Sequence, residues 1–154
     1  MTHSLVVLLI AQSFHVFLDG QPRMAVVDAL HEASDLLSQP SCGAVFDDFH
    51  NTEGRPLSDI LRAADRTPRE WLSVLYFVEG DSARCRADMT MTAYTKPGSR
   101  VVWICGQTFS ASFSMAVKGG AYIIIHEMLH TVGLGENPPS SAEITAVVAR
   151  RCRR

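Results

Sequence analysis

Apolar residues recur every three or four positions along much of this chain, a period that brings side chains onto one face of a helix. The clearest stretch runs from Pro22 to Gln39 and ends at Pro40, a residue that cannot continue a helix. Residues 67–70 (TPRE) are typical of a capped helix start. The helix they begin is expected to bury Trp71, Leu72, Leu75 and Tyr76. The same reasoning predicts helices over residues 42–49, 57–64, 109–117, 121–132 and 140–151.

Strands are predicted in two regions. Residues 89–95 (MTMTAYT) and 100–105 (RVVWIC) flank the turn sequence Lys96-Pro97-Gly98-Ser99, which is typical of a β-hairpin. Residues 14–18 (FHVFL) are compatible with a first strand of the domain. The chain contains no internal repeat, low-complexity tract or linker. We therefore predict one α+β domain with a small antiparallel sheet.

Composition excludes several classes of partner. The chain has 154 residues, of which 47% are apolar and 19% charged, and its net charge is −2, so it offers no overall field for nucleic acid or anionic membranes. No apolar run reaches the ~20 residues of a membrane-spanning helix. Arg150, Arg151, Arg153 and Arg154 crowd the end of the chain, but this short run without aromatic residues indicates a solvated helix end. We expect a monomer that does not bind nucleic acid and has no membrane-spanning segment.

Cysteine usage and the first residues bear on the compartment. The four cysteines, Cys42, Cys85, Cys105 and Cys152, include no CxxC pair. They fit either two disulfides of an exported protein or four free thiols of a cytosolic one. Residues 1–18 are either an atypical signal segment, with an apolar run at 5–10 and small residues at 11–13, or the first strand. We expect a secreted or periplasmic protein whose single domain occupies residues 19–154.

One motif carries chemistry. Residues 126–130 read His-Glu-Met-Leu-His, and on a helix the two histidines point from one face, where both can bind one metal ion. Glu127 follows the first ligand directly, so its carboxylate can reach a metal-bound water and take its proton as the water attacks a carbonyl. The predicted helix is apolar on nearly every side. Buried polar side chains need partners, and a Zn²⁺ ion supplies one.

The residues that follow extend the motif to His126-Glu127-x-x-His130-x-x-Gly133-x-x-Glu136. Gly133 can end the helix and turn the chain back below the metal. Over about residues 121–136 the chain resembles the zincin metallopeptidases, and its spacing is closest to that of the metzincin branch. The resemblance implies a minimal zincin-like domain with a buried HExxH helix and a zinc-dependent peptidase activity on peptide or protein substrates. It also implies that an edge strand, here Val101–Ile104, holds the substrate in extended form.

The sequence offers two candidates for the third zinc ligand. Glu136 stands where metzincins have histidine or aspartate, and no methionine follows Met128 to form their methionine turn. The alternative is Glu143, by analogy with the gluzincin branch, in which a glutamate from the next helix completes the site. Glu143 also has a structural explanation, because Ser140-Ser141-Ala142-Glu143 is a capping box. We favour Glu136 as the third ligand.

Two further expectations concern activity. Tyr94, near a predicted strand end, is a candidate oxyanion stabiliser. In the favoured interpretation water completes the zinc site and Glu127 is the general base and later the proton donor to the leaving amine. The alternative is a catalytically inactive binding protein of zincin fold, whose zinc is structural and fully enclosed by protein ligands.

Overall fold

The computed structural model describes residues 13–115 and 117–153. Its helices are α1 (Gly20–Leu37), α2 (Pro40–Gly43), α3 (Leu57–Ala63), α4 (Pro68–Leu72), α5 (Ser82–Ala87), α6 (Gly106–Met115), α7 (Val117–Val132) and α8 (Ser141–Arg151), with a 3₁₀ turn at Ala44–Asp47. Its strands are β1 (His15–Phe17), β2 (Tyr76–Glu79), β3 (Ala93–Thr95) and β4 (Val101–Ile104). The predicted mixture of helices and strands is confirmed.

The four strands form one sheet in the order β1-β2-β4-β3. β1, β2 and β4 are parallel, with His15 opposite Tyr76 and Tyr76 opposite Val101, and only β3 runs antiparallel to β4. The predicted hairpin is therefore present, but the prediction of an antiparallel sheet is wrong, because the sheet is mixed. The expectation that Val101–Ile104 lies at the edge is also wrong, since β4 is interior and β3 forms that edge.

The parallel part of the sheet was not predicted because the start of β2 has the spacing of a helix. Trp71, Leu72, Leu75 and Tyr76 have helical spacing, yet α4 ends at Leu72 and Tyr76 begins a strand. The side chain of Tyr76 is 42% exposed, so it does not enter the core as expected. The next residue, Phe77, is fully buried, as alternation along a strand requires.

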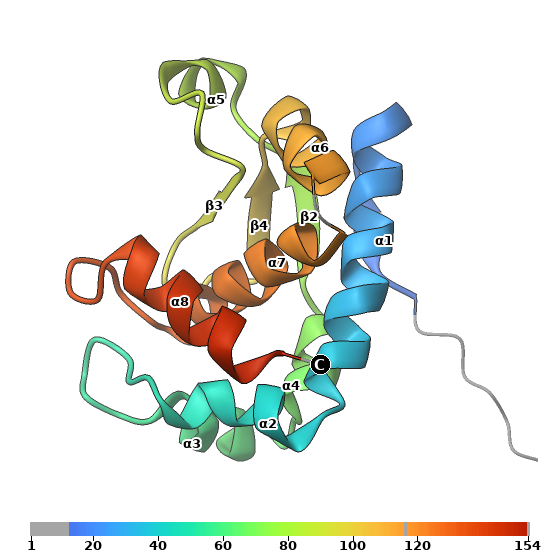
Figure 1. The fold of residues 1–154 in the computed structure, drawn as a ribbon. Coiled ribbons are helices and arrows are strands. Elements are labelled where there is room, and N and C mark those ends of the chain that lie inside the picture. The colour runs from blue at the N-terminus through green and yellow to red at the C-terminus, as the bar shows by residue number, and fades with distance from the viewer. Residues whose placement is uncertain (1–12, 116, 154) are drawn as a thin grey trace, which may run out of the picture.

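The core lies between one face of the sheet and the helices α1, α6 and α7. Val16, Phe77, Val102 and Ile104 point into it from the strands. In Figure 1, α7 passes through the middle of the molecule, with α1 on one side and α8 on the other, and both helices contact it. This central position explains why α7, the helix that carries the two histidines of the motif, has so few polar residues.

Two disulfides tie peripheral segments to this core. Cys42 in α2 is bonded to Cys152 at the end of α8, and Cys85 in α5 to Cys105 at the end of β4. Gly80 leaves room for the second bond, because a Cβ atom there would lie 2.8 Å from the sulfur of Cys85. All four cysteines are thus paired; of the two alternatives that spacing left open, two disulfides are confirmed and four free thiols are wrong.

The expectations for residues 1–18 and for membrane-spanning segments can be compared with the structure only where it describes the chain. Residues 15–17 form β1, in agreement with a first strand, whereas the apolar run at 5–10 lies outside the described residues. Among the helices of the described part of the chain, none combines the length and apolar character required to span a bilayer.

Candidate metal centre

Helix α7 presents the motif residues to a single cleft. His126 and His130 are one helical turn apart, and both side chains, like that of Glu127, are only 7% exposed. All three line the cleft, which has a volume of about 490 Å³. It lies between α7, the start of α8 and the segment from α5 to β3 and its turn. The other lining residues are Arg84, Asp88, Thr90, Met91, Thr92, Ala93, Tyr94, Thr95, Pro97, Ile123, Glu136, Ser141 and Thr145.

Gly133 ends α7 and turns the chain back towards the cleft. Its φ of +120° is a backbone conformation that residues with a side chain rarely adopt. The amide of Leu134 donates a hydrogen bond to the carbonyl of Leu129, and that of Gly133 donates to the carbonyl of His130, which satisfies carbonyls at the helix end. The turn brings Glu136 to the two histidines, as the spacing predicts.

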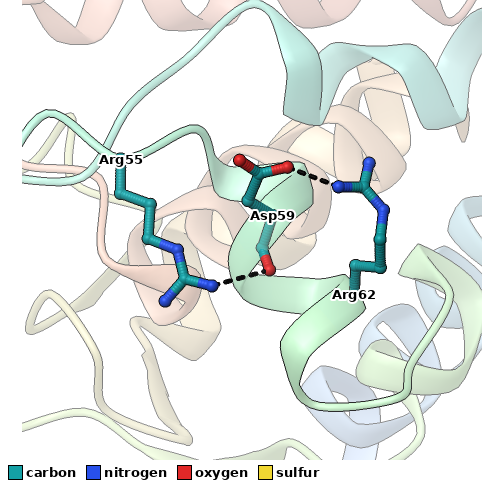
Figure 2. A network of polar contacts seen from close by, with 3 residues as sticks. All are labelled: Arg55, Asp59 and Arg62. Atoms are coloured by element: carbon teal, nitrogen blue, oxygen red, sulfur yellow. Dashed lines mark hydrogen bonds and ion pairs between the residues drawn. The ribbon is translucent and has the colours of Figure 1, made fainter.

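The loop that begins at Asn51 supports this turn from behind. A Cβ atom added to Gly133 would lie 3.2 Å from the Cβ of Asn51. The side-chain oxygen of Asn51 accepts a hydrogen bond from the amide of Arg55. The Arg55 side chain in turn donates to the carbonyl of Asp59 in α3, whose carboxylate pairs with Arg62 (Figure 2). The glycine turn is thus packed against a loop that is itself hydrogen-bonded to a helix.

Hydrogen bonds orient both imidazoles. Nδ1 of His130 lies 2.8 Å from the carbonyl oxygen of Leu134, which can only accept, so Nδ1 carries the proton and Nε2 of the neutral ring has a free electron pair. Nδ1 of His126 lies 2.9 Å from Oγ1 of Thr145 in α8. When His126 donates to that hydroxyl, its Nε2 also has a free electron pair. Thr145 is not among the residues predicted from the sequence, because its contact with His126 depends on how α8 packs against α7.

The two Nε2 atoms are 3.2 Å apart. Two free electron pairs at this distance repel each other unless a cation or a proton lies between them. Two nitrogens bound to one tetrahedral zinc, each at about 2.0–2.1 Å, are about 3.3 Å apart. Glu136 completes the group, since one ligand atom from each of His126, His130 and Glu136 lies within 4.8 Å of the others. Geometry and donor chemistry therefore fit a zinc ion.

Burial gives the pKa values at the site opposite directions. It lowers the pKa of His126 to about 4, with a further contribution from His130, so the ring is neutral and able to bind a metal at neutral pH. Burial, followed by the negative charge of Glu136, raises the pKa of Glu127 to about 8, while Arg84 acts in the lowering direction. One carboxyl oxygen of Glu127, Oε2, is buried with no hydrogen-bond partner among the described residues.

Glu143 and Tyr94, the two remaining candidates from the sequence, have different surroundings. Glu143 is exposed and accepts hydrogen bonds from the amide and the hydroxyl of Ser140 at the start of α8, and these bonds lower its pKa. It therefore serves as a cap, and the group that could hold a metal ion contains Glu136. Tyr94 lines the cleft, as its proposed role requires, and its hydroxyl oxygen accepts a hydrogen bond from the amide of Asp81.

The metal-free protein should lose stability between pH 6.5 and 8. In this range the folded protein holds a proton on Glu127 that the unfolded chain, with a pKa of 4.5, has released, so stability falls as pH rises. Below 6.5 the opposite shift of His126 offsets this effect. We expect a net loss of about 1 kcal/mol from pH 6.5 to 8, measured by chemical denaturation in the presence of a chelator.

Glu127→Gln, which cannot ionise, should abolish this slope. The matched surface substitution Glu143→Gln should keep it, because Glu143 is exposed. Parallel pH profiles for the wild-type protein and Glu127→Gln would show that the carboxyl of Glu127 ionises normally in the folded state.

Comparison of the chain with protein-family models, with curated proteins and with solved structures finds no match in any of the three. The geometry of the site is therefore the basis for assigning a function.

Proposed function

We propose that this protein is a zinc metallopeptidase of zincin type. In this proposal His126, His130 and Glu136 hold the zinc, and Glu127 is the general base. The observation that carries the proposal is the 3.2 Å approach of two imidazole Nε2 atoms beside a carboxylate, with the unpartnered Oε2 of Glu127 buried in the same cleft. A buried carboxyl oxygen without a partner costs stability, and a role in proton transfer gives a reason for its retention.

The chain's own groups fit the steps of peptide hydrolysis. Zinc bound at the three ligands would act as a Lewis acid, polarising a carbonyl and lowering the pKa of water. Positive charge there would also lower the raised pKa of Glu127, so that its carboxylate can accept a proton at neutral pH. Oε2 of Glu127 then holds that proton and passes it to the leaving amine nitrogen. The hydroxyl of Tyr94 is the proposed donor to the developing oxyanion.

The number of ligands supports a catalytic site. A structural zinc is enclosed by four protein ligands, whereas a catalytic zinc has three and an open position. Among the described residues, the candidate group has three members, and the carboxylate of Glu143 is used in its capping box. This arrangement favours the peptidase over the alternative of an inactive protein with a structural zinc.

A peptide is the substrate class that the surroundings favour. β3 is an edge strand, and each of its residues, Ala93 to Thr95, lines the cleft. An edge strand has N–H and C=O groups available to pair with another extended segment. A peptide added along β3 would pass through the cleft beside Glu127.

The compartment and the assembly belong to the same proposal. Two disulfides persist in oxidising surroundings and are rare in the cytosol. We therefore propose a secreted or periplasmic peptidase that acts as a monomer.

The first test measures zinc and its third ligand. Protein purified without added metal should contain one zinc per chain by ICP-MS, and competition with a chromophoric chelator should give the affinity. Glu136→Gln should weaken zinc binding at least about tenfold, because it replaces a charged ligand. The same substitution at Glu143 should leave the affinity unchanged, because it touches only the helix cap. Absence of zinc, or the reverse order of the two variants, would contradict the assignment.

The second measurement is hydrolysis of a denatured protein such as casein, followed by mass spectrometry of the products. Chelation should abolish cleavage, and stoichiometric zinc should restore it. Zinc binding without any cleavage would support the structural-zinc alternative instead.

A further inference from the structure

Arg84 in α5 (Ser82–Ala87) occupies a distinctive position in the cleft. Of the described residues that line the cleft, it is the one with a permanent positive charge. It is exposed, and among the described residues no ion pair joins it to a carboxylate. Its guanidinium is therefore available to an anionic group that enters the cleft.

Several contacts hold Arg84 in place despite its exposure. Its guanidinium carbon lies 3.9 Å from the centre of the Tyr94 ring, a cation–π contact that leaves the N–H groups able to donate. The Tyr94 ring is stacked on Trp103 of β4, with ring centres 5.5 Å apart. The Tyr94 hydroxyl receives the amide of Asp81, and the Asp81 carboxylate caps α5 by accepting the amide of Arg84. The arginine is thus fixed relative to the sheet at both its backbone and its side chain.

The second disulfide restrains the same helix. Cys85, the residue after Arg84, is bonded to Cys105 at the end of β4. A helix of six residues without a buried side chain would otherwise have little to hold it against the domain. The disulfide holds α5 and the Tyr94 ring holds the guanidinium, so Arg84 loses less freedom on binding a ligand than an unrestrained arginine would.

Of the three acidic groups that line the cleft in the part of the chain that the structure describes, Asp88 and Glu136 are already engaged. The carboxylate of Asp88 accepts hydrogen bonds from the amide and the hydroxyl of Thr90. Glu136 belongs to the proposed zinc group, where its charge would be neutralised. The third, Glu127, is buried; the charge of Arg84 acts on its pKa, but no ion pair joins the two among the described residues. Once zinc is bound, the exposed Arg84 can therefore pair with an anionic ligand.

We infer that Arg84 is a specificity-determining residue that binds a carboxylate of the peptide substrate. The inference rests on the proposed function and deepens it by naming a substrate class, acidic peptides. The planar guanidinium matches a carboxylate with two parallel N–H donors. That carboxylate belongs either to an aspartate or glutamate side chain or to the C-terminus of the peptide, and the two sources require different probes.

The test uses binding, so that it does not depend on turnover. The probes are short alanine-based peptide hydroxamates, which chelate zinc, in matched pairs that differ only in a carboxylate. One set has glutamate or glutamine at each successive position, and the other has a free or an amidated C-terminus. Dissociation constants for the zinc-loaded full chain are measured by calorimetry.

In the wild-type protein we expect one pair to favour the carboxylate member by about five- to tenfold, the range for a partly solvated charged pair. Arg84→Gln should remove this preference while the amide member binds as before, and Arg84→Lys should retain part of it. The matched control is Arg86→Gln, which removes the same charge from the same helix at a position that does not line the cleft. This variant should keep the preference.

The outcomes separate this inference from the proposed function. If no pair favours the carboxylate, or if Arg84→Gln keeps the preference, the inference is overturned while the zinc site remains. If zinc-loaded protein binds no member of any pair, the inference is likewise overturned. If ICP-MS finds no zinc in the same samples, the proposed function fails and the inference fails with it.

Discussion

Replacing Glu127 by glutamine should reduce kcat/KM for peptide hydrolysis by about 10²–10⁴-fold, the usual contribution of a general acid–base group. Glutamine has nearly the same size but can neither accept nor return the proton. Because Glu127 is not one of the three candidate ligands, zinc should remain bound. The measurement is steady-state kinetics on a peptide found to be cleaved, together with the zinc content of the same preparation.

The control for this variant is Glu143→Gln, the same chemical change at an exposed capping carboxylate. It should alter the stability of α8 slightly and leave kcat unchanged. Hydrolysis that persists in Glu127→Gln would contradict the assignment of the general base. Loss of zinc from that variant would show that Glu127 acts on the metal site and not through proton transfer.

Glu127 and Glu143 show how strongly environment separates two identical side chains. Burial and a neighbouring carboxylate raise the pKa of Glu127 to about 8, whereas hydrogen bonds from Ser140 lower that of Glu143. The first group holds or releases a proton near neutral pH, and the second remains ionised. Only the first has the property that acid–base catalysis requires.

Several local features of this chain were predictable from its sequence because short-range rules determine them. The capping boxes at Thr67 and Ser140 were recognisable from spacing and are present in the structure. So was the positive φ at Gly133, because an HExxH helix that ends three residues later needs a residue without a side chain there. The grouping of Glu136 with the histidines follows from this turn.

Features that depend on contacts between distant segments were not predictable in the same way. β2 is defined by its parallel neighbours β1 and β4, and a strand of four residues gives too short a pattern to be separated from a helix end. The role of Thr145 depends on how α8 crosses α7, and that of Arg84 on the disulfide and the Tyr94 stack. Neither residue belongs to a sequence motif.

The second large effect concerns the Cys42–Cys152 disulfide. Replacing both cysteines by alanine should lower the free energy of unfolding by about 4–5 kcal/mol, because a closed loop of this length strongly restricts the unfolded chain. The two cysteines are 110 residues apart, and both are fully buried. Urea denaturation of the metal-free wild-type and variant proteins under oxidising conditions measures the difference.

The Cys85–Cys105 bond provides the matched comparison, since it closes a loop of only 20 residues. On loop entropy alone its removal should cost about 1–2 kcal/mol less.

The two variants should also differ at the site. Loss of the long-range bond frees the end of α8, the helix that carries Thr145, and should weaken zinc binding, whereas loss of the short-range bond frees α5 and should weaken the preference for carboxylates. Equal destabilisation by both variants would mean that local packing, and not restriction of the unfolded chain, accounts for the contribution of the long-range bond.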